Sequence, residues 1–144
     1  MSDEQLFLLA NGTAFFAWLL LLIFPFRPFT NKVLIGVVVT ILCITYAVLV
    51  YNSLKPGNFK DFMTLGGVTA MLSVPGAALA GWIHYLAFDL MTGLFIANNA
   101  AKHGIGYAWL LPCLILTFLL GPIGLLLYFL IRWALTKYYF ADNY

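Results

Sequence analysis

Four long apolar segments, separated by short polar or glycine- and proline-rich stretches, dominate the pattern of the chain. Their hydrophobic residues run almost continuously instead of alternating at every second position, which favours helices over the strands of a membrane barrel. Each segment is long enough to cross the ~30 Å apolar core of a bilayer as a helix. The pattern therefore predicts four transmembrane helices, over residues 5–26, 33–54, 76–102 and 109–133.

The stretch between the second and third spans, residues 59–74, is shorter and more polar than the four spans. Lys60 and Asp61 stand near its start and are followed by apolar residues, which is typical of a helix that lies at the membrane interface. The expected fold is an all-α bundle of four transmembrane helices with one interfacial helix, and residues 1–144 form a single transmembrane domain.

The composition supports this fold class. Only 8% of the 144 residues are charged and 64% are hydrophobic, whereas a soluble domain carries roughly 25% charged residues. The chain lacks the polar surface that water requires, so we expect an integral membrane protein with membrane lipids as partners. The net charge of +2 comes from scattered lysines and arginines, which gives no reason to expect nucleic acid as a partner.

The basic residues do not orient a bundle of four spans. Positive charge gathers on the cytoplasmic side of membrane proteins. Here the four spans divide the basic residues almost evenly between the two sides, with Lys55, Lys60, Arg132 and Lys137 on one and Arg27, Lys32 and Lys102 on the other.

The third span carries ionisable residues, His84 and Asp89, near its middle. Such a group costs at least ~2.5–3.5 kcal/mol on insertion scales and usually faces a partner, a water-filled cavity or a substrate path. On a helical wheel, Tyr85, Thr92 and Asn99 fall on the same half of the helix as this pair. The third span therefore has one polar face, which we interpret as the candidate site.

Two polar features of the other spans can meet that face. Asn11 in the first span is expected to form a hydrogen bond across the bundle to the third span, as a substrate contact or as a helix–helix contact. Pro122, at the centre of the fourth span, has no N–H to donate to the carbonyl of Phe118 and predicts a kink. A neighbour must satisfy the freed carbonyl, unless the kink only shapes the packing.

The histidines argue against a metal site. His84 and His103 lie ~28 Å apart along one helix, so they cannot bind the same ion. The sequence accordingly predicts no metal site and no cofactor. General acid–base chemistry fits better, because His84 and Asp89 provide a proton donor and a proton acceptor in a dry site. The alternative is a structural His–Asp pair that holds the bundle together.

Two runs of residues resemble a known family. They are Trp82-Ile83-His84-Tyr85-Leu86-Ala87-Phe88-Asp89-Leu90 and Gly121-Pro122-Ile123-Gly124-Leu125-Leu126. In these runs the chain resembles the abscisic-acid-deficient-4-like family of small membrane proteins, and its first span, with Asn11 and the apolar run that ends at Pro25, is also similar. The resemblance covers most of the chain, and the His/Asp helix is its most specific part.

The resemblance implies a carotenoid-processing membrane protein in a bacterial inner membrane or a plastid or thylakoid membrane. Plant members are required to convert violaxanthin into the allenic neoxanthin, which needs one proton delivered to an epoxide oxygen and one removed from a polyene carbon. We expect His84 and Asp89 to be catalytic, in roles that stay open. We expect a carotenoid or another isoprenoid to contact Asn11, Tyr85, Thr92 and Asn99.

Two other functions fit the same sequence. A non-catalytic protein that binds a carotenoid or a quinone would retain pigment without converting it. An assembly factor for a larger membrane complex would use the polar face to contact a partner helix. Association of the chain into a homo-oligomer is compatible with all three functions.

Overall fold

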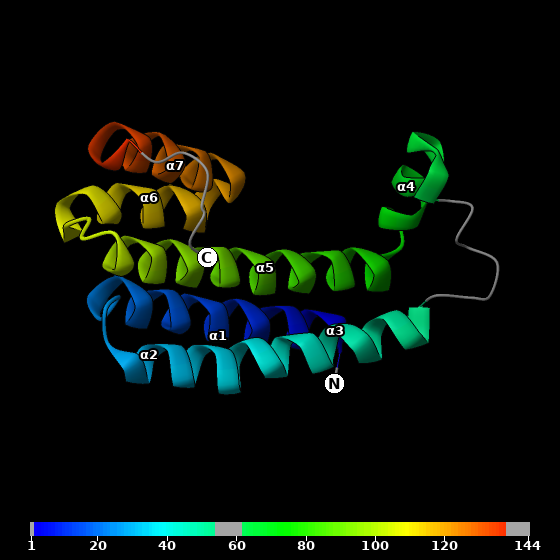
Figure 1. Ribbon diagram of the computed structural model, residues 1–144. Coiled ribbons are helices and arrows are strands. Elements are labelled where there is room, and N and C mark those ends of the chain that lie inside the picture. Colours follow the sequence, from blue (N-terminus) through cyan, green and yellow to red (C-terminus); the bar gives the residue numbers. More distant parts are fainter. Residues whose placement is uncertain (1, 54–61, 138–144) are drawn as a thin grey trace.

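The computed structural model describes residues 2–53 and 62–137, which form a set of packed helices (Figure 1). Helix α1 (Asp3–Ile23) begins with a capping box, in which the Ser2 side chain accepts from the backbone N–H of Gln5 and the Gln5 side chain accepts from that of Ser2. Such a box satisfies N–H groups that a helix start leaves free. Helix α1 confirms the predicted first span and ends shortly before Pro25.

The second span is one continuous helical stretch made of α2 (Pro28–Val33), the π-helical segment η1 (Leu34–Val39) and α3 (Thr40–Ser53). It starts five residues earlier than the sequence predicts, because Pro28 occupies the first helical position, where a missing N–H is harmless. Much of its surface is apolar and exposed, as expected for a helix that faces lipid.

Helix α5 (Pro75–Lys102) lies at the centre of the molecule, between α1 and α3 on one side and the last two helices on the other (Figure 1). Gly93 allows α1 to approach closely, because a Cβ at this position would lie 2.6 Å from the ring of Trp18. Trp18 and the neighbouring Ala97 are almost fully buried. Small residues of α5 therefore let this helix pack closely against α1.

The predicted fourth span is wrong, because two shorter helices take its place. Helix α6 (Tyr107–Leu120) ends at Gly121, and helix α7 (Pro122–Thr136) folds back beside it (Figure 1). Each is ~21–23 Å long at 1.5 Å per residue, which falls short of the ~30 Å apolar core. Within the described residues, three helical stretches are long and apolar enough to cross a membrane, namely Asp3–Ile23, Pro28–Ser53 and Pro75–Lys102.

The reversal between α6 and α7 has a local cause. Gly121 has a positive φ of 43°, a conformation that favours glycine, and Pro122 then starts α7 with its fixed φ. Gly124 lets the two helices touch, because a Cβ there would collide with the backbone nitrogen and the hydroxyl oxygen of Thr117. Pro122 thus accompanies a complete turn instead of the kink that we expected.

A short helix precedes α5. Helix α4 (Leu65–Leu72) is capped by the Thr64 side chain, which accepts from the backbone N–H of Gly67. It contacts α5 and stands apart from the other helices (Figure 1). It lies inside the predicted interfacial segment, whose first residues, 59–61, fall outside the described part of the chain.

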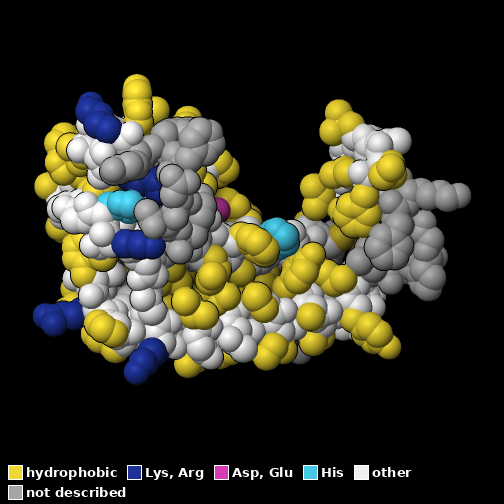
Figure 2. Space-filling view, viewed as in Figure 1, with side chains coloured by type: hydrophobic (Ala, Val, Ile, Leu, Met, Phe, Trp, Pro, Cys, Tyr) yellow, Lys and Arg dark blue, Asp and Glu magenta, His cyan; other side chains and the backbone are white. Residues whose placement is uncertain are grey.

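The hairpin changes how the basic residues are distributed. Because α7 folds back, its C-terminal end lies at the same end of the molecule as the α1–α2 turn and the C-terminal end of α5 (Figure 1). The Tyr107 hydroxyl, at the start of α6, donates to the carbonyl of Leu22 at this end. Figure 2 shows Lys and Arg side chains gathered at this end, opposite α4. The basic residues placed there are Arg27, Lys32, Lys102, Arg132 and Lys137, whereas the near-even division that we expected separated Arg132 and Lys137 from the other three.

We expect this basic end to be cytoplasmic, because short positively charged segments stay on that side. A green fluorescent protein fused to the full-length C-terminus should fluoresce, and alkaline phosphatase at the same point should be inactive. The same reporters fused after Ser53 should give the opposite result, because one span separates the two points. A bundle of four spans would instead give the same result at both positions.

Candidate functional site

The Asp89 carboxyl lies against the tip of the α6–α7 hairpin. A Cβ on Gly121 would come within 2.6 Å of the Asp89 Oδ1 atom, so the glycine provides the space that the carboxyl occupies. The Oδ2 atom is buried, and among the described residues it has no hydrogen-bond partner. Asp89 sits close to the middle of α5. A polar group with unused bonding capacity therefore lies deep within the longest helix.

Tyr85 lies one turn before Asp89 on α5, and the two side chains are close enough to share a hydrogen bond. The Tyr85 hydroxyl also reaches the carbonyl of Leu119 at the end of α6, at a long 3.5 Å. The polar face of α5 thus provides a donor to the hairpin, one residue away from the Phe118 carbonyl that we expected to accept it. The N-terminus of α7, which carries partial positive charge, starts beside the Asp89 carboxylate.

The neighbours of His84 differ from those of Asp89. Its ring is stacked on Phe88, with centroids 4.5 Å apart, and it meets the edge of Tyr46 at 5.4 Å. It lines a pocket of about 300 Å³ between α3, α4 and α5, which we call the α3–α4–α5 pocket. The residues that line it are Tyr46, Val50, Ser53, Phe62, Met71, Leu72, Val74, Ala77, Ala80, Gly81 and His84.

His84 and Asp89 do not form a pair. They are five residues apart, which is ~7.5 Å along the helix axis, and their directions differ by ~140°. Each has its own neighbours, and the exposed ring of Phe88 belongs to the same stretch of α5. The structural His–Asp pair is therefore absent from the described contacts. His84 and Asp89 are therefore two separate polar groups, and Phe88 lies between their directions on the helical wheel.

The surface above this part of α5 is hollow. Figure 2 shows a depression between α4 and the α6–α7 hairpin, with hydrophobic side chains along its floor and walls. It exists because the hairpin covers only the C-terminal half of α5 (Figure 1). The helices around it carry exposed apolar residues, among them Leu72 on α4, Phe88 on α5 and Leu119 on α6.

Asn11 forms the predicted hydrogen bond to the third span. Its Oδ1 accepts from the indole N–H of Trp82 at 3.0 Å, and its Nδ2 donates to the carbonyl of Phe7 at 2.8 Å. Trp82 in turn stacks on Tyr85, with ring centroids 5.2 Å apart. Asn11 of α1 therefore holds Trp82, which stacks against Tyr85.

The other two predicted contact residues are occupied within the fold. The Thr92 hydroxyl donates to the carbonyl of Phe88 on its own helix. Asn99 is buried, and its Oδ1 accepts from the Tyr128 hydroxyl at 2.6 Å and from Arg132 at 2.9 Å. These bonds fasten α7 to α5. A direct contact of Thr92 or Asn99 with a substrate stays a prediction.

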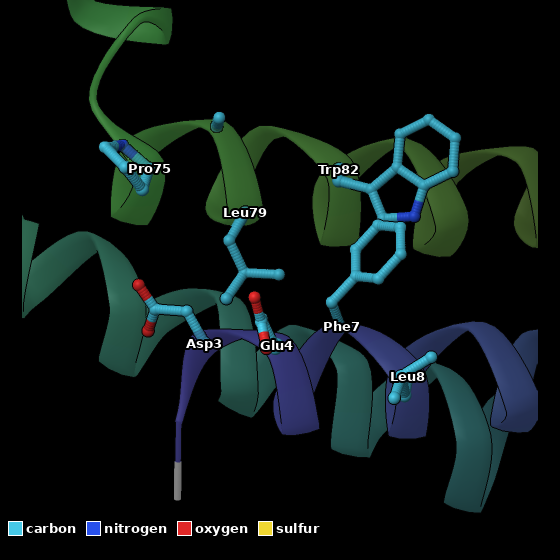
Figure 3. Close-up of a pocket in the computed structure, with 8 residues that line it drawn as sticks. Asp3, Glu4, Phe7, Leu8, Pro75, Leu79 and Trp82 are labelled. Carbon is cyan, nitrogen blue, oxygen red and sulfur yellow. The ribbon is translucent and has the colours of Figure 1, made fainter.

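A further pocket lies on the α1 side of α5. It has a volume of about 560 Å³ and is lined by Asp3, Glu4, Phe7, Leu8, Pro75, Ala78, Leu79 and Trp82. Figure 3 shows Phe7 and Trp82 directed toward one another, and their ring centroids are 6.0 Å apart. Asp3 and Glu4 stand in the first turn of α1, where negative charge favours a helix start. The start of α1 therefore explains the presence of Asp3 and Glu4 in this pocket without a bound ligand.

Sequence reasoning missed Tyr46 and Gly121. Tyr46 lies in a span that reads as plain scaffold, and only its contact with His84 reveals it. Gly121 was part of a visible Gly-Pro dipeptide, which is a turn signal, but its closeness to Asp89 depends on the folded hairpin.

Comparison with known proteins identifies the family that the sequence resembles. The model of the family described as ABA DEFICIENT 4-like matches residues 5–128, which is most of the chain and includes both the His/Asp helix and the hairpin tip. No curated protein matches the chain, and no solved structure matches it. The chain therefore belongs to the ABA DEFICIENT 4-like family, a membership that, together with its apolar helices, suggests a carotenoid-related membrane protein.

Proposed function

We propose that the protein is an isomerase that binds a carotenoid or a similar isoprenoid in the hollow along α5 and transfers protons within it. The observation that carries this proposal is the half-buried Asp89 carboxyl at the hairpin tip, whose buried Oδ2 atom has no hydrogen-bond partner among the described residues. Burying such a group without a hydrogen bond costs free energy. In the acid form of Asp89, the carboxyl O–H would donate to an oxygen atom of a bound ligand.

The two polar groups on either side of Phe88 suit the opening of an epoxide. Asp89 in its acid form donates a proton to the epoxide oxygen, and the C–O bond on the polyene side breaks. His84 removes a proton from the adjacent polyene carbon, whose electron pair forms the new double bond of an allene. One proton enters and one leaves, so the product is an isomer, and no oxidant or reductant is needed.

The neighbours of each group hold it in place. Tyr85 lies close enough to Asp89 to hold its carboxyl by a hydrogen bond, and Trp82 and Asn11 support Tyr85 from behind. The His84 ring, although exposed, is oriented by its contacts with Phe88 and Tyr46. Fixed catalytic groups lower the cost of reaching the reactive geometry.

The proposal is tested in a host that makes epoxidised carotenoids. Wild-type protein should produce a new allenic pigment with the mass of its precursor, detected by chromatography and mass spectrometry. Asp89→Asn and His84→Ala should each remove it, whereas His103→Ala should retain it, because His103 stands at the far end of α5. Unchanged pigments in both site variants would exclude the catalytic roles. Stoichiometric pigment on the wild-type protein without conversion would indicate a binding protein.

A further inference from the structure

The α3–α4–α5 pocket contains polar groups that the fold itself does not use. Tyr46 and Ser53 of α3 and His84 of α5 line it, among otherwise apolar walls. Within residues 2–53 and 62–137, neither the two hydroxyl groups nor the His84 ring nitrogens form a hydrogen bond. An apolar pocket of about 300 Å³ with a few polar groups has the form of a small-molecule site.

The pocket runs from His84 toward the N-terminal end of α5. Tyr46 and His84 are in contact at its inner end. Ser53 lies at the outer end, against Gly76, where a Cβ would come 3.1 Å from the Ser53 Oγ atom. Gly76 precedes His84 by eight residues, or ~12 Å of helix. The inner end, with the Tyr46 hydroxyl, is therefore the part nearest to the proposed reaction centre.

Gly81 leaves room in the middle of the pocket. A Cβ there would lie 3.4 Å from a terminal methyl carbon of Leu72, in ordinary contact. A larger side chain would fill the space between α4 and α5. The width of the pocket at the level of Gly81 thus depends on the absence of a side chain on α5. This width suits a compact ring better than a single chain.

We infer that this pocket binds the end ring of the isoprenoid ligand and that the Tyr46 hydroxyl recognises an oxygen atom on that ring. This rests on the proposed function, because the ring must lie next to the atoms that react between His84 and Asp89. Apolar walls alone would hold a hydrocarbon ring equally well. The unpartnered hydroxyl makes the pocket selective for a ring with a hydroxyl or carbonyl group.

The test compares two carotenoids that differ only in ring oxygen. Purified protein in detergent micelles is titrated with zeaxanthin, whose end rings carry hydroxyl groups, and with its hydrocarbon parent β-carotene, and tryptophan fluorescence quenching is followed. One hydrogen bond predicts about fivefold tighter binding of zeaxanthin. Tyr46→Phe should abolish this preference and leave the affinity for β-carotene unchanged. Tyr51→Phe is the matched control, because Tyr51 is 86% exposed on the same helix.

A second variant tests the location of the ring. Gly81→Phe should abolish binding of both pigments, with the helical circular dichroism signal and the melting temperature unchanged. Normal binding by this variant, or a zeaxanthin preference that survives in Tyr46→Phe, would overturn the pocket assignment. If the preference depends on Tyr46 but the wild-type protein converts no pigment, the pocket stands and the isomerase proposal fails. Wild-type protein that binds neither pigment overturns both.

Discussion

Gly124→Val is expected to separate α6 from α7 and to lower the stability of the protein more than any other single change considered. A Cβ at this position collides with the backbone nitrogen and the hydroxyl of Thr117 and lies 2.6 Å from the carbonyl oxygen of Cys113. Overpacking typically costs about 1–3 kcal/mol. Here the contacted atoms include backbone and cannot rotate away, so we expect a loss of about 3 kcal/mol or more.

The measurement is thermal unfolding in detergent micelles, followed by circular dichroism. Gly12→Val is the matched control, because a Cβ on Gly12 meets no atom within 4 Å and the residue also lies within a helix. The control should melt close to the wild type. A Gly124→Val protein with an unchanged melting temperature would show that α6 and α7 do not touch as described.

Gly121→Ala is expected to reduce pigment conversion by about 100-fold although every proposed catalytic side chain is retained. The added Cβ would lie 2.6 Å from the Asp89 Oδ1 atom, so the carboxyl must move, and a misplacement of about 1 Å can cost 100-fold in rate. The positive φ of Gly121 adds strain of about 1–3 kcal/mol for any L-residue. Conversion and melting temperature should therefore fall together.

A double variant separates these two causes. Asp89→Ala removes the carboxyl that the new methyl group would strike, so Gly121→Ala combined with Asp89→Ala should recover part of the lost stability, with conversion still absent. The backbone strain remains in this variant and limits the recovery. If the combined changes destabilise the protein by the full sum of the single effects, the carboxyl and the hairpin tip are not in contact.

The fold class and the centre of the site follow from local patterns in the sequence. The apolar segments identify three spanning stretches, and the polar face of the third span places Tyr85 and Asp89 where the hairpin meets them. The bond from Trp82 to Asn11 was also predictable, because an amide inside an apolar helix needs a partner.

The hairpin was not predictable from hydropathy. Residues 109–133 are almost all apolar, with Arg132 as the single charged residue, so their average hydropathy is that of a single span. Their path is decided instead by the backbone of Gly121 and by the close contact of Gly124 with Thr117. Each half is too short to cross the bilayer alone. Gly121 at the turn and Gly124, two residues after the start of α7, are the signal for this hairpin in the sequence.

The separation of His84 from Asp89 was visible in the sequence, whereas the neighbours of each residue were not. An angular difference of ~140° follows from their five-residue spacing. The contact of His84 with Tyr46, and that of Asp89 with Gly121, join segments more than 30 residues apart. Such contacts depend on how the helices pack, which a single sequence does not specify.

Because the α6–α7 hairpin stops halfway along α5, we expect the acyl chains of the bilayer, and not an aqueous vestibule, to border the hollow beside Asp89. An apolar molecule dissolved in the membrane would then enter this hollow laterally and leave by the same route without passing through water. Its occupancy then follows its mole fraction among the lipids, so aqueous solubility sets no limit on what the protein can reach.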